Sequence, residues 1–289
     1  MTASPTRCAV LGDPVEHSLS PALHRAAYAW LGLEGWHYDP VRVPGGTLPD
    51  FLDGLGPEWR GLSLTMPLKR ELLALADERG WEVSGRARSA GGANTLVREA
   101  AGWRGDNTDL PGAVAAVRER HLGPVERVLV LGGGATAASI GLALCDLGAR
   151  EVTLLVRSAD RAGETLRTIA AHSSAPHVRA LEPAAVQHDG GEAGGVPAAD
   201  VLVSTVPADA QDPGLLSACG AALLFEAVYD PWPTPLAAAA LDHRTALVSG
   251  LDLLVHQAAL QVEQFTGRSV PVEVLRSAGE AALAARGHG

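Results

Sequence analysis

The chain has 289 residues, of which 47% are hydrophobic and 19% charged, and its formal net charge is −10. This length accommodates one large domain or two medium ones with a substantial core, and the charged fraction is too low for a disordered chain. Nonspecific nucleic-acid binding requires a basic face, so the acidic balance argues against a nucleic-acid partner.

The cysteines and the N-terminus indicate the class of compartment. Cys8, Cys145 and Cys219 lie far apart and show no metal-ligand spacing, so we expect neither a disulfide framework nor a metal site. This pattern favours a reduced, cytoplasmic setting. The first seven residues form a short polar stretch, so we expect no signal peptide. No run of 18 apolar residues occurs, so we expect no membrane span.

The first part of the chain alternates short apolar runs with helical stretches. Strands are expected over residues 7–12, 36–43 and 61–66, helices over 21–33, 47–56 and 69–80, and a hairpin over 93–99 and 102–107. This alternation predicts an α/β domain with a mainly parallel sheet over residues 1–110.

The alternation begins again near Pro111 and Gly112, which mark a helix entrance. Residues 127–158 are typical of a strand, a glycine turn, a helix and a second strand. Further strands are expected over 199–207, 221–229 and 245–250, a surface loop over 180–200, and a periodic helix over 251–267. We therefore expect a Rossmann-like dinucleotide-binding domain over 111–250.

Gly132, Gly134 and Ala137 form a G-x-G-x-x-A pattern between a predicted strand and a predicted helix. The first glycine permits a tight turn, the second lets the backbone approach a pyrophosphate, and the small third residue allows close packing. A purely structural turn is the alternative, but the strand–turn–helix–strand context favours dinucleotide binding. The expected contact residues are Gly132, Gly133, Gly134, Ala135, Thr136 and Ala137.

The residues after the second strand of this unit indicate which dinucleotide binds. An NAD site usually has Asp or Glu there, whereas this chain has Arg157 and Ser158, followed by Arg161. A guanidinium can pair with a 2′-phosphate through its planar fork, and a hydroxyl can add a bond. An ordinary exposed arginine is the alternative, but the absence of an acidic residue favours NADP.

Short polar side chains follow the strands of the first domain. Ser18 and Ser20 come after the first strand, and Thr65 and Lys69 after the third. Ligands of open α/β sheets bind at the carboxyl ends of strands, so we expect these side chains on one rim. Helix capping is the alternative for Ser20.

Further amides, hydroxyls and carboxylates come from Asn94, Thr95 and residues 106–109, for which turn formation is the alternative. Together, these groups suit a small polyhydroxylated acid. Lys69 is the only lysine of the chain, in which arginine serves everywhere else. An ammonium can give up a proton where a guanidinium rarely does, so Lys69 is a candidate for proton chemistry.

Eight blocks of the sequence, in order over about residues 8–267, resemble the shikimate dehydrogenase family. They are GDPVEHSLSPALH (12–24), GLSLTMPLK (61–69), GGANTLV (91–97), GDNTDLPG (105–112), LGGGATAA (131–138), VRSADRA (156–162), EAVYDPWPTPL (226–236) and SGLDLLVHQAALQVEQFTG (249–267). Asp252 and the WPTPL stretch resemble the actinobacterial branch. Ser63 departs from the family, in which Asn is usual at this position.

The resemblance implies an NADP-dependent, reversible reduction of 3-dehydroshikimate to shikimate, in the pathway to aromatic amino acids. It implies that residues 1–110 are a substrate-binding catalytic domain, completed by C-terminal helices over about 251–289. Lys69 and Asp109 would be the catalytic pair. The substrate would be bound by Ser18, Ser20, Thr65, Asn94, Tyr229 and Gln257, and Thr205, Val206 and Gly250 would lie along the cofactor.

Several alternatives stay open at this point. A quinate/shikimate or aminoshikimate dehydrogenase of broader specificity would share the fold and the pair, and a non-catalytic NADPH sensor would share the fold. Lys69 could transfer the proton, or chiefly bind the substrate and stabilise charge. The expected assembly is a monomer or a homodimer.

Overall fold

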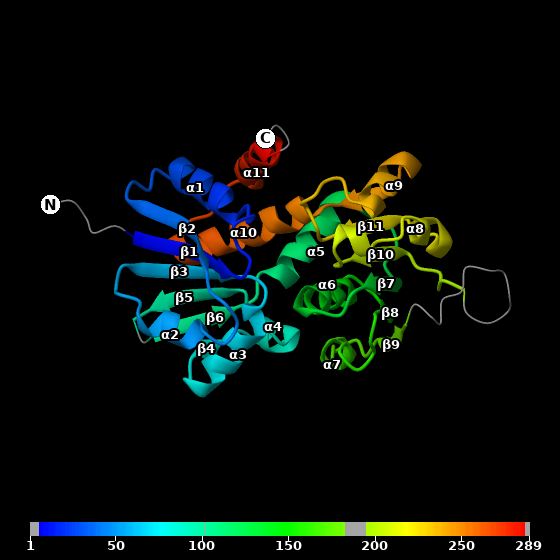
Figure 1. Cartoon of the computed structure of the whole chain (residues 1–289), viewed down its shortest axis with the longest axis horizontal. Helices are drawn as coiled ribbons and strands as arrows, with labels where there is room; N and C mark the ends of the chain where they lie inside the picture. Colours follow the sequence, from blue (N-terminus) through cyan, green and yellow to red (C-terminus); the bar gives the residue numbers. More distant parts are fainter. Residues whose placement is uncertain (1–5, 101, 183–194, 287–289) are drawn as a thin grey trace. The chain divides into compact units, whose positions relative to one another are not determined.

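The computed structural model describes residues 6–100, 102–182 and 195–286, and the chain forms two compact units (Figure 1). The first unit combines Met1–Thr108 with Leu254–Gly289, and the second comprises Asp109–Leu253. The chain returns to the first unit inside the long helix α10 (Gly250–Thr266). Among the described helices, none combines the length and the apolar character that a bilayer crossing needs.

The first unit is built on a six-stranded sheet with the strand order β2-β1-β3-β5-β6-β4. Only β5 runs against the others, because it pairs antiparallel with β3 and β6 while the remaining pairs are parallel. The mainly parallel sheet and the β5–β6 hairpin were both predicted, and both are confirmed. The strands are β1 (Thr6–Gly12), β2 (Trp36–Arg42), β3 (Trp59–Leu64), β4 (Glu82–Val83), β5 (Thr95–Glu99) and β6 (Gly102–Asp106).

Helices cover both faces of this sheet (Figure 1). On one face, leucines of α2 and α3, such as Leu52 and Leu72, pack with strand residues such as Leu62. On the other face, α1 packs on α11, and the ring of Phe265 on α10 lies against β3, where a Cβ at Gly61 would be 2.3 Å from it. The helices are α1 (Ser20–Trp30), α2 (Leu48–Asp53), α3 (Leu68–Glu78), α4 (Gly85–Ala90), α10 and α11 (Val272–Arg286).

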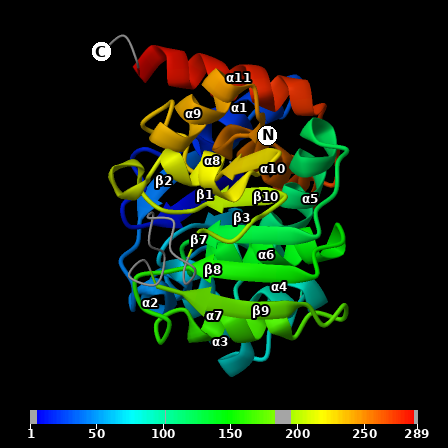
Figure 2. The ribbon, with the colours of Figure 1, turned by 90° about the vertical axis from the view of Figure 1, so that its right-hand side faces the viewer.

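The second unit is built on a six-stranded parallel sheet with the order β12-β11-β10-β7-β8-β9. The sequence order reverses between β7 and β10, which is the strand order of dinucleotide-binding sheets with a switch point at that place. Figure 2 shows β10, β7, β8 and β9 side by side. The strands are β7 (Arg127–Leu131), β8 (Glu151–Leu155), β9 (His177–Leu181), β10 (Val201–Ser204), β11 (Leu223–Glu226) and β12 (Ala246–Val248).

Two apolar clusters lie on the two faces of this second sheet. One contains Ile140 and Ile169 from helices with Val130 from β7, and the other contains Leu216 and Leu236 from helices on the opposite face. The helices are α5 (Asp109–Arg120), α6 (Ala135–Asp146) and α7 (Gly163–Ala170) in the first cluster, and α8 (Gly214–Cys219) and α9 (Pro235–His243) in the second.

The edge strand β9 was not predicted. Its sequence HVRAL is polar at alternate positions and only partly buried, so it lacks the apolar run that marked the other strands. The predicted loop over 180–200 therefore begins later than expected, at the end of β9. Residues 183–194 of that loop lie outside the described residues.

Candidate active site

Ser18 and Ser20 lie between β1 and the body of α1. The backbone N–H of Ser20 donates a 3.3 Å hydrogen bond to Oγ of Ser18, which is half-buried. The N-cap residue is Leu19, and α1 begins at Ser20 itself, without a side-chain cap bond. The capping alternative for Ser20 is therefore wrong, because the helix starts one residue earlier than the position of Pro21 indicated.

Thr65 lies in the connection from β3 to α3, and Lys69 is the second residue of α3. The backbone N–H of Thr65 donates a 2.9 Å bond to the carbonyl of Leu11 at the end of β1, and the carbonyl of Lys69 accepts a 2.9 Å bond from Ala93. The strands β1 and β3 are parallel neighbours, so the segments that follow them leave the same edge of the sheet. The structure thus places Ser18, Thr65 and Lys69 on segments that follow the carboxyl ends of neighbouring parallel strands, as predicted.

The buried amide of Asn94 precedes β5 and has a defined orientation. Its Oδ1 accepts a 2.8 Å bond from the backbone N–H of Thr108 and another of 2.8 Å from Oγ1 of Thr95. A backbone N–H can only donate, so Oδ1 must face it, and Nδ2 donates a 3.0 Å bond to Oε1 of Gln257. The two predicted substrate-binding amides, Asn94 and Gln257, are therefore direct partners.

Gln261, one helical turn after Gln257, extends these contacts toward β2 and α1. Its Nε2 donates a 2.9 Å bond to Oγ1 of Thr95, and its Oε1 accepts a 2.8 Å bond from Oγ of Ser63. The hydroxyl of Tyr38 donates a 2.6 Å bond to Ser63. Ser63, the departure from the family, is therefore a member of a buried chain of hydrogen bonds.

His24 closes this chain of hydrogen bonds. It is fully buried, its ring stacks on that of Tyr38 with centroids 3.9 Å apart, and its Nε2 lies 3.3 Å from Oε1 of Gln261. Burial lowers the pKa of His24 to about 3, so the ring is neutral. Because Oε1 of Gln261 can only accept, Nε2 is the nitrogen that carries the proton.

Tyr229 lies in the second unit, in the segment between β11 and α9, and is half-buried. Both ends of that segment are tied to the buried carboxylate of Glu226, which accepts a 3.0 Å bond from the backbone of Val228 and a 2.8 Å bond from Oγ1 of Thr234. Burial raises the pKa of Glu226 above its ordinary value. One carboxyl group therefore anchors the segment that carries Tyr229.

The glycine turn leads from β7 into α6. Gly132 has φ +105°, and a Cβ there would lie 2.3 Å from Oγ1 of Thr205, so only glycine fits. A Cβ on Gly133 would lie 2.9 Å from that of Ala162. Gly134 is the N-cap of α6 and supplies no capping side chain, which leaves the first N–H groups of the helix, beginning at Ala135, Thr136 and Ala137, without a side-chain cap.

Arg157, Ser158 and Arg161 follow β8. Arg157 and Arg161 are exposed, whereas Oγ of Ser158 is 3.5 Å from the backbone nitrogen of Arg161 within the same turn. Thr205 and Val206 follow β10, the strand beside β7, and a Cβ on Gly132 would also lie 3.3 Å from Val206. The predicted cofactor residues of β7, β8 and β10 therefore share the carboxyl edge of three neighbouring parallel strands.

Gly250 begins α10, and a Cβ there would lie 2.4 Å from the carbonyl oxygen of Ala227. Next to it, the backbone N–H of Asp252 donates to Oγ of Ser249 over 3.1 Å, and Oδ2 of Asp252 accepts a 2.9 Å bond from the backbone of Ser249. This reciprocal arrangement is a capping box. Oδ1 of Asp252 also accepts a 2.8 Å bond from Arg120, so the aspartate caps α10 and ties it to α5.

Four side chains that hydrogen-bond to Asn94 or to Asp106 were not predicted from the sequence. Gln261 and Gln264 follow Gln257 by four and seven positions, so helical periodicity alone places them on the same face of α10. Ser84 and Arg86 belong to the short helix α4, whose sequence GRARSA has no apolar period that could have revealed it.

The three cysteines are buried and form no disulfide. Burial raises the pKa of Cys8 to about 11 and that of Cys145 to about 12, so these thiols stay protonated near neutral pH. Within the described ranges, no group of three or more His, Cys, Asp or Glu side chains is placed to hold a metal ion.

Comparison with known proteins identifies relatives that match 95% of the chain. A family model of the shikimate dehydrogenase substrate binding domain matches residues 10–96, and one of the shikimate 5′-dehydrogenase C-terminal domain matches residues 250–278. The shikimate dehydrogenase (NADP(+)) of Synechococcus sp. (strain JA-3-3Ab) is 33% identical over 290 residues, which cover 95% of this chain and 93% of the relative.

Solved structures are similar over the same extent. The shikimate dehydrogenase of Mycobacterium tuberculosis is 41% identical, with a TM-score of 0.82 over 96% of this chain and 100% of that one. The shikimate 5-dehydrogenase of Thermus thermophilus, in complex with NADP(H) and shikimate, is 29% identical, with a TM-score of 0.79 over 96% and 100% of the two chains. The chain therefore belongs to the shikimate dehydrogenase family.

Proposed function

We propose that this chain is an NADP-dependent shikimate dehydrogenase, an oxidoreductase that interconverts 3-dehydroshikimate and shikimate on the route to aromatic amino acids. The observation that carries the proposal is the similarity to shikimate dehydrogenases (NADP(+)) over 95% of the chain. The Thermus thermophilus relative in complex with NADP(H) and shikimate supports the same pair of ligands.

The second unit fits NADP. Gly132 and Gly133 permit the tight packing of this turn against Thr205 and Ala162, whereas a Cβ at Gly134 would meet no protein atom within 4 Å. The N-terminus of α6 supplies N–H donors suited to a pyrophosphate. Arg157 is the exposed cation at the end of β8, where we place the 2′-phosphate, with Ser158 and Arg161 beside it. Thr205, Val206 and Gly250 line the remaining cofactor path in this proposal.

The first unit supplies the groups for the substrate. We assign the carboxylate of shikimate to the hydroxyls of Ser18 and Ser20, and its ring hydroxyls to Thr65, Asn94 and Gln257. The Asn94–Gln257 pair supports this assignment. Oε1 of Gln257 accepts a bond from Asn94, so the other atom of the Gln257 amide, Nε2, is the donor that we assign to a ring hydroxyl. Tyr229 is the remaining residue predicted to bind the substrate.

Lys69 and Asp109 are the proposed catalytic pair. NADPH, when bound, supplies the hydride for the ring ketone. The ketone oxygen then gains negative charge, which the ammonium of Lys69 stabilises, and it takes up one proton to become the hydroxyl. We assign to Asp109, a buried carboxylate at the start of α5, the role of orienting the ammonium of Lys69.

A panel of assays tests the proposed function. Oxidation of shikimate and of quinate, each with NADP+ and with NAD+, is followed by the absorbance of the reduced cofactor. Turnover of shikimate with NADP+ far above the other three combinations is expected. Comparable turnover of quinate would indicate the broader dehydrogenase instead, and NADPH binding without any turnover would indicate a sensor.

The compartment and the assembly belong to the same proposal. The buried, disulfide-free cysteines support a reducing, cytoplasmic location. We expect a monomer or a homodimer, and light scattering on the purified chain distinguishes the two.

A further inference from the structure

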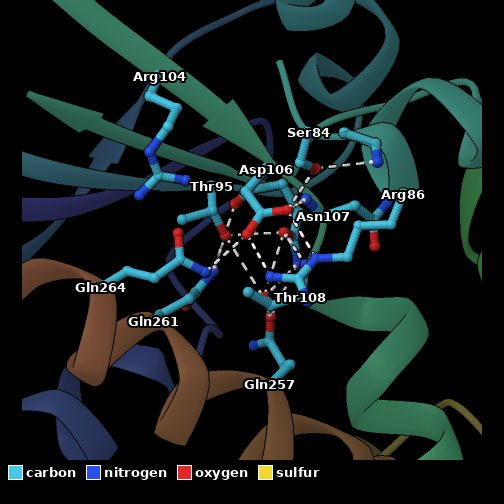
Figure 3. A network of polar contacts seen from close by, with 12 residues as sticks. Ser84, Arg86, Thr95, Arg104, Asp106, Asn107, Thr108, Gln257, Gln261 and Gln264 are labelled. Atoms are coloured by element: carbon cyan, nitrogen blue, oxygen red, sulfur yellow. Dashed lines mark hydrogen bonds and ion pairs between the residues drawn. The ribbon is translucent and has the colours of Figure 1, made fainter. Parts of the chain in front are cut away.

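Asp106, the last residue of β6, is a buried carboxylate held by five hydrogen-bond donors (Figure 3). Its Oδ1 accepts from Oγ of Ser84 at 2.5 Å, from Nε of Arg86 at 2.7 Å and from the backbone N–H of Asn107 at 2.7 Å. Its Oδ2 accepts from Nη2 of Arg86 and from Nε2 of Gln264, the latter at 2.8 Å. We call Ser84, Arg86, Asp106 and Gln264 the Asp106 clamp.

The clamp joins three elements of the first unit. Ser84 is the N-cap of α4 and also accepts a 3.2 Å bond from the backbone of Ala87, so one side chain serves the helix and the carboxylate together. Gln264 brings in α10. Burial by itself would raise the pKa of Asp106, but the bonds from Arg86 and Ser84 hold that pKa below its ordinary value. The carboxylate is therefore charged and saturated with donors at neutral pH.

The clamp leads directly to the proposed substrate site. Asn107, whose N–H meets Asp106, donates from Nδ2 to the carbonyl of Gly92 over 2.9 Å. The next residue, Thr108, holds Oδ1 of Asn94 with its backbone N–H at 2.8 Å. The backbone carbonyl of Asp106 itself accepts a 3.0 Å bond from the N–H of Asn94.

The same clamp acts on the rotation of α10. Gln257 and Gln264 are seven residues, or about two turns, apart and therefore share a face of the helix. The bond from Gln264 to Asp106 at one end of that face restrains the rotation of α10 about its own axis. It thereby sets the angle at which Gln257 meets Asn94 at the other end. No atom of the clamp needs to touch the substrate for this effect.

We propose that Asp106 is a positioning residue, whose clamp with Ser84, Arg86 and Gln264 sets the orientation of the Asn94–Gln257 amide pair that receives the substrate. This inference rests on the proposed function. Its consequence is a specific one. Loosening the clamp weakens the use of shikimate and leaves NADPH binding unchanged, because the predicted NADP residues all belong to the second unit.

Two mild variants test the proposal, since Asp106→Asn would place an amide NH₂ donor in a buried site that already holds five donors and so endangers folding. Gln264→Met removes one donor at nearly constant length, and Arg86→Ala removes the fork from the half-exposed side of the clamp. We expect each to raise KM for shikimate about tenfold, because misoriented binding groups lose substrate affinity steeply. The Kd for NADPH should stay within about twofold. Arg86→Lys, which keeps one charged donor, should raise KM for shikimate less than Arg86→Ala does.

The control is Arg88→Ala, on the same helix α4, which removes an exposed ion pair with Asp77 and should leave KM unchanged. A lower thermal midpoint with unchanged KM for shikimate in both test variants would reduce the clamp to a structural ion pair and overturn the proposal. Wild-type protein without shikimate activity in the same assay would overturn the proposed function and this inference with it.

Discussion

The hydroxyl oxygen of Thr205 stands 2.3 Å from the point that a Cβ atom on Gly132 would occupy. Thr205 is held in place by a 2.8 Å bond to the carbonyl of Leu131, and Gly132 has φ +105°, a conformation that other residues rarely adopt. We predict that Gly132→Ala lowers the free energy of unfolding by about 2 kcal/mol or more, measured by thermal or urea denaturation.

Gly134→Ala is the matched comparison on the same turn. Gly134 has φ −88°, and an added Cβ would meet nothing within 4 Å. Stability should change by less than about 0.5 kcal/mol, whereas the Kd for NADPH should rise, because the new methyl group occupies the proposed approach of the pyrophosphate. Equal stability of the two variants would contradict the strain assigned to Gly132.

Arg157→Ala should weaken NADPH binding about 10- to 100-fold and NADH binding hardly at all. A charge-assisted pair with a phosphate is worth about 1.5–3 kcal/mol, and NADH has no 2′-phosphate to lose. Fluorescence titration with both cofactors measures the two Kd values. Arg150→Ala, an exposed arginine just before the other end of the same strand β8, is the control. A parallel loss for NADPH and NADH would remove Arg157 from the 2′-phosphate.

Lys69→Ala and Asp109→Asn should lower kcat by about 10²- to 10⁴-fold while the Kd for NADPH stays near the wild-type value. Lys69→Arg separates the two roles left open for the lysine. It keeps the positive charge but rarely releases a proton, so it should be as slow as Lys69→Ala if Lys69 transfers the proton. Activity between that of Lys69→Ala and wild type would indicate electrostatic stabilisation instead.

The control for the catalytic variants is Arg79→Ala, at the C-cap of the same helix α3, which removes a surface ion pair with Asp53. It should retain wild-type kcat, because Arg79 lies at the opposite end of α3 from Lys69. Near-normal turnover in both Lys69→Ala and Asp109→Asn would exclude the proposed catalytic pair.

The glycine turn was predictable from the sequence because its requirements are local. Strand β7, the positive φ of Gly132 and the start of α6 arise within a few consecutive residues, and each leaves a mark in composition. Five strands of the second unit were predicted from the regular alternation, whereas β9, whose polar edge position left no apolar run, was not.

The first unit was predictable only in part. The Asn94–Gln257 bond joins residues 163 positions apart, so no local pattern announces it, and the family resemblance alone paired them with one substrate. The Asp106 clamp depends on α4 and on the azimuth of α10, which only tertiary packing determines. The error at Ser20 has a local origin, since Pro21 is compatible with the first or the second helical position.

The pH dependence of stability should carry a contribution from His24. Its pKa is about 3 in the folded chain because burial disfavours the cation, against about 6.5 in an unfolded chain. Between these values the unfolded state binds the additional proton, so this contribution to stability is present above pH 6.5 and is lost as the pH falls. The loss approaches about 1.4 kcal/mol per pH unit, or about 2 kcal/mol between pH 6.5 and 5.

Urea unfolding at pH 7 and pH 5 measures this effect in the wild type and in His24→Phe, which keeps the stack on Tyr38 but cannot be protonated. Tryptophan fluorescence reports mainly the first unit, which holds Trp30, Trp36, Trp59, Trp81 and Trp103 of the six tryptophans. The wild type should lose about 2 kcal/mol more than His24→Phe on this change of pH. His37→Gln, at an exposed position on β2, should follow the wild type. Identical losses in the wild type and His24→Phe would mean that His24 is not held neutral by the fold.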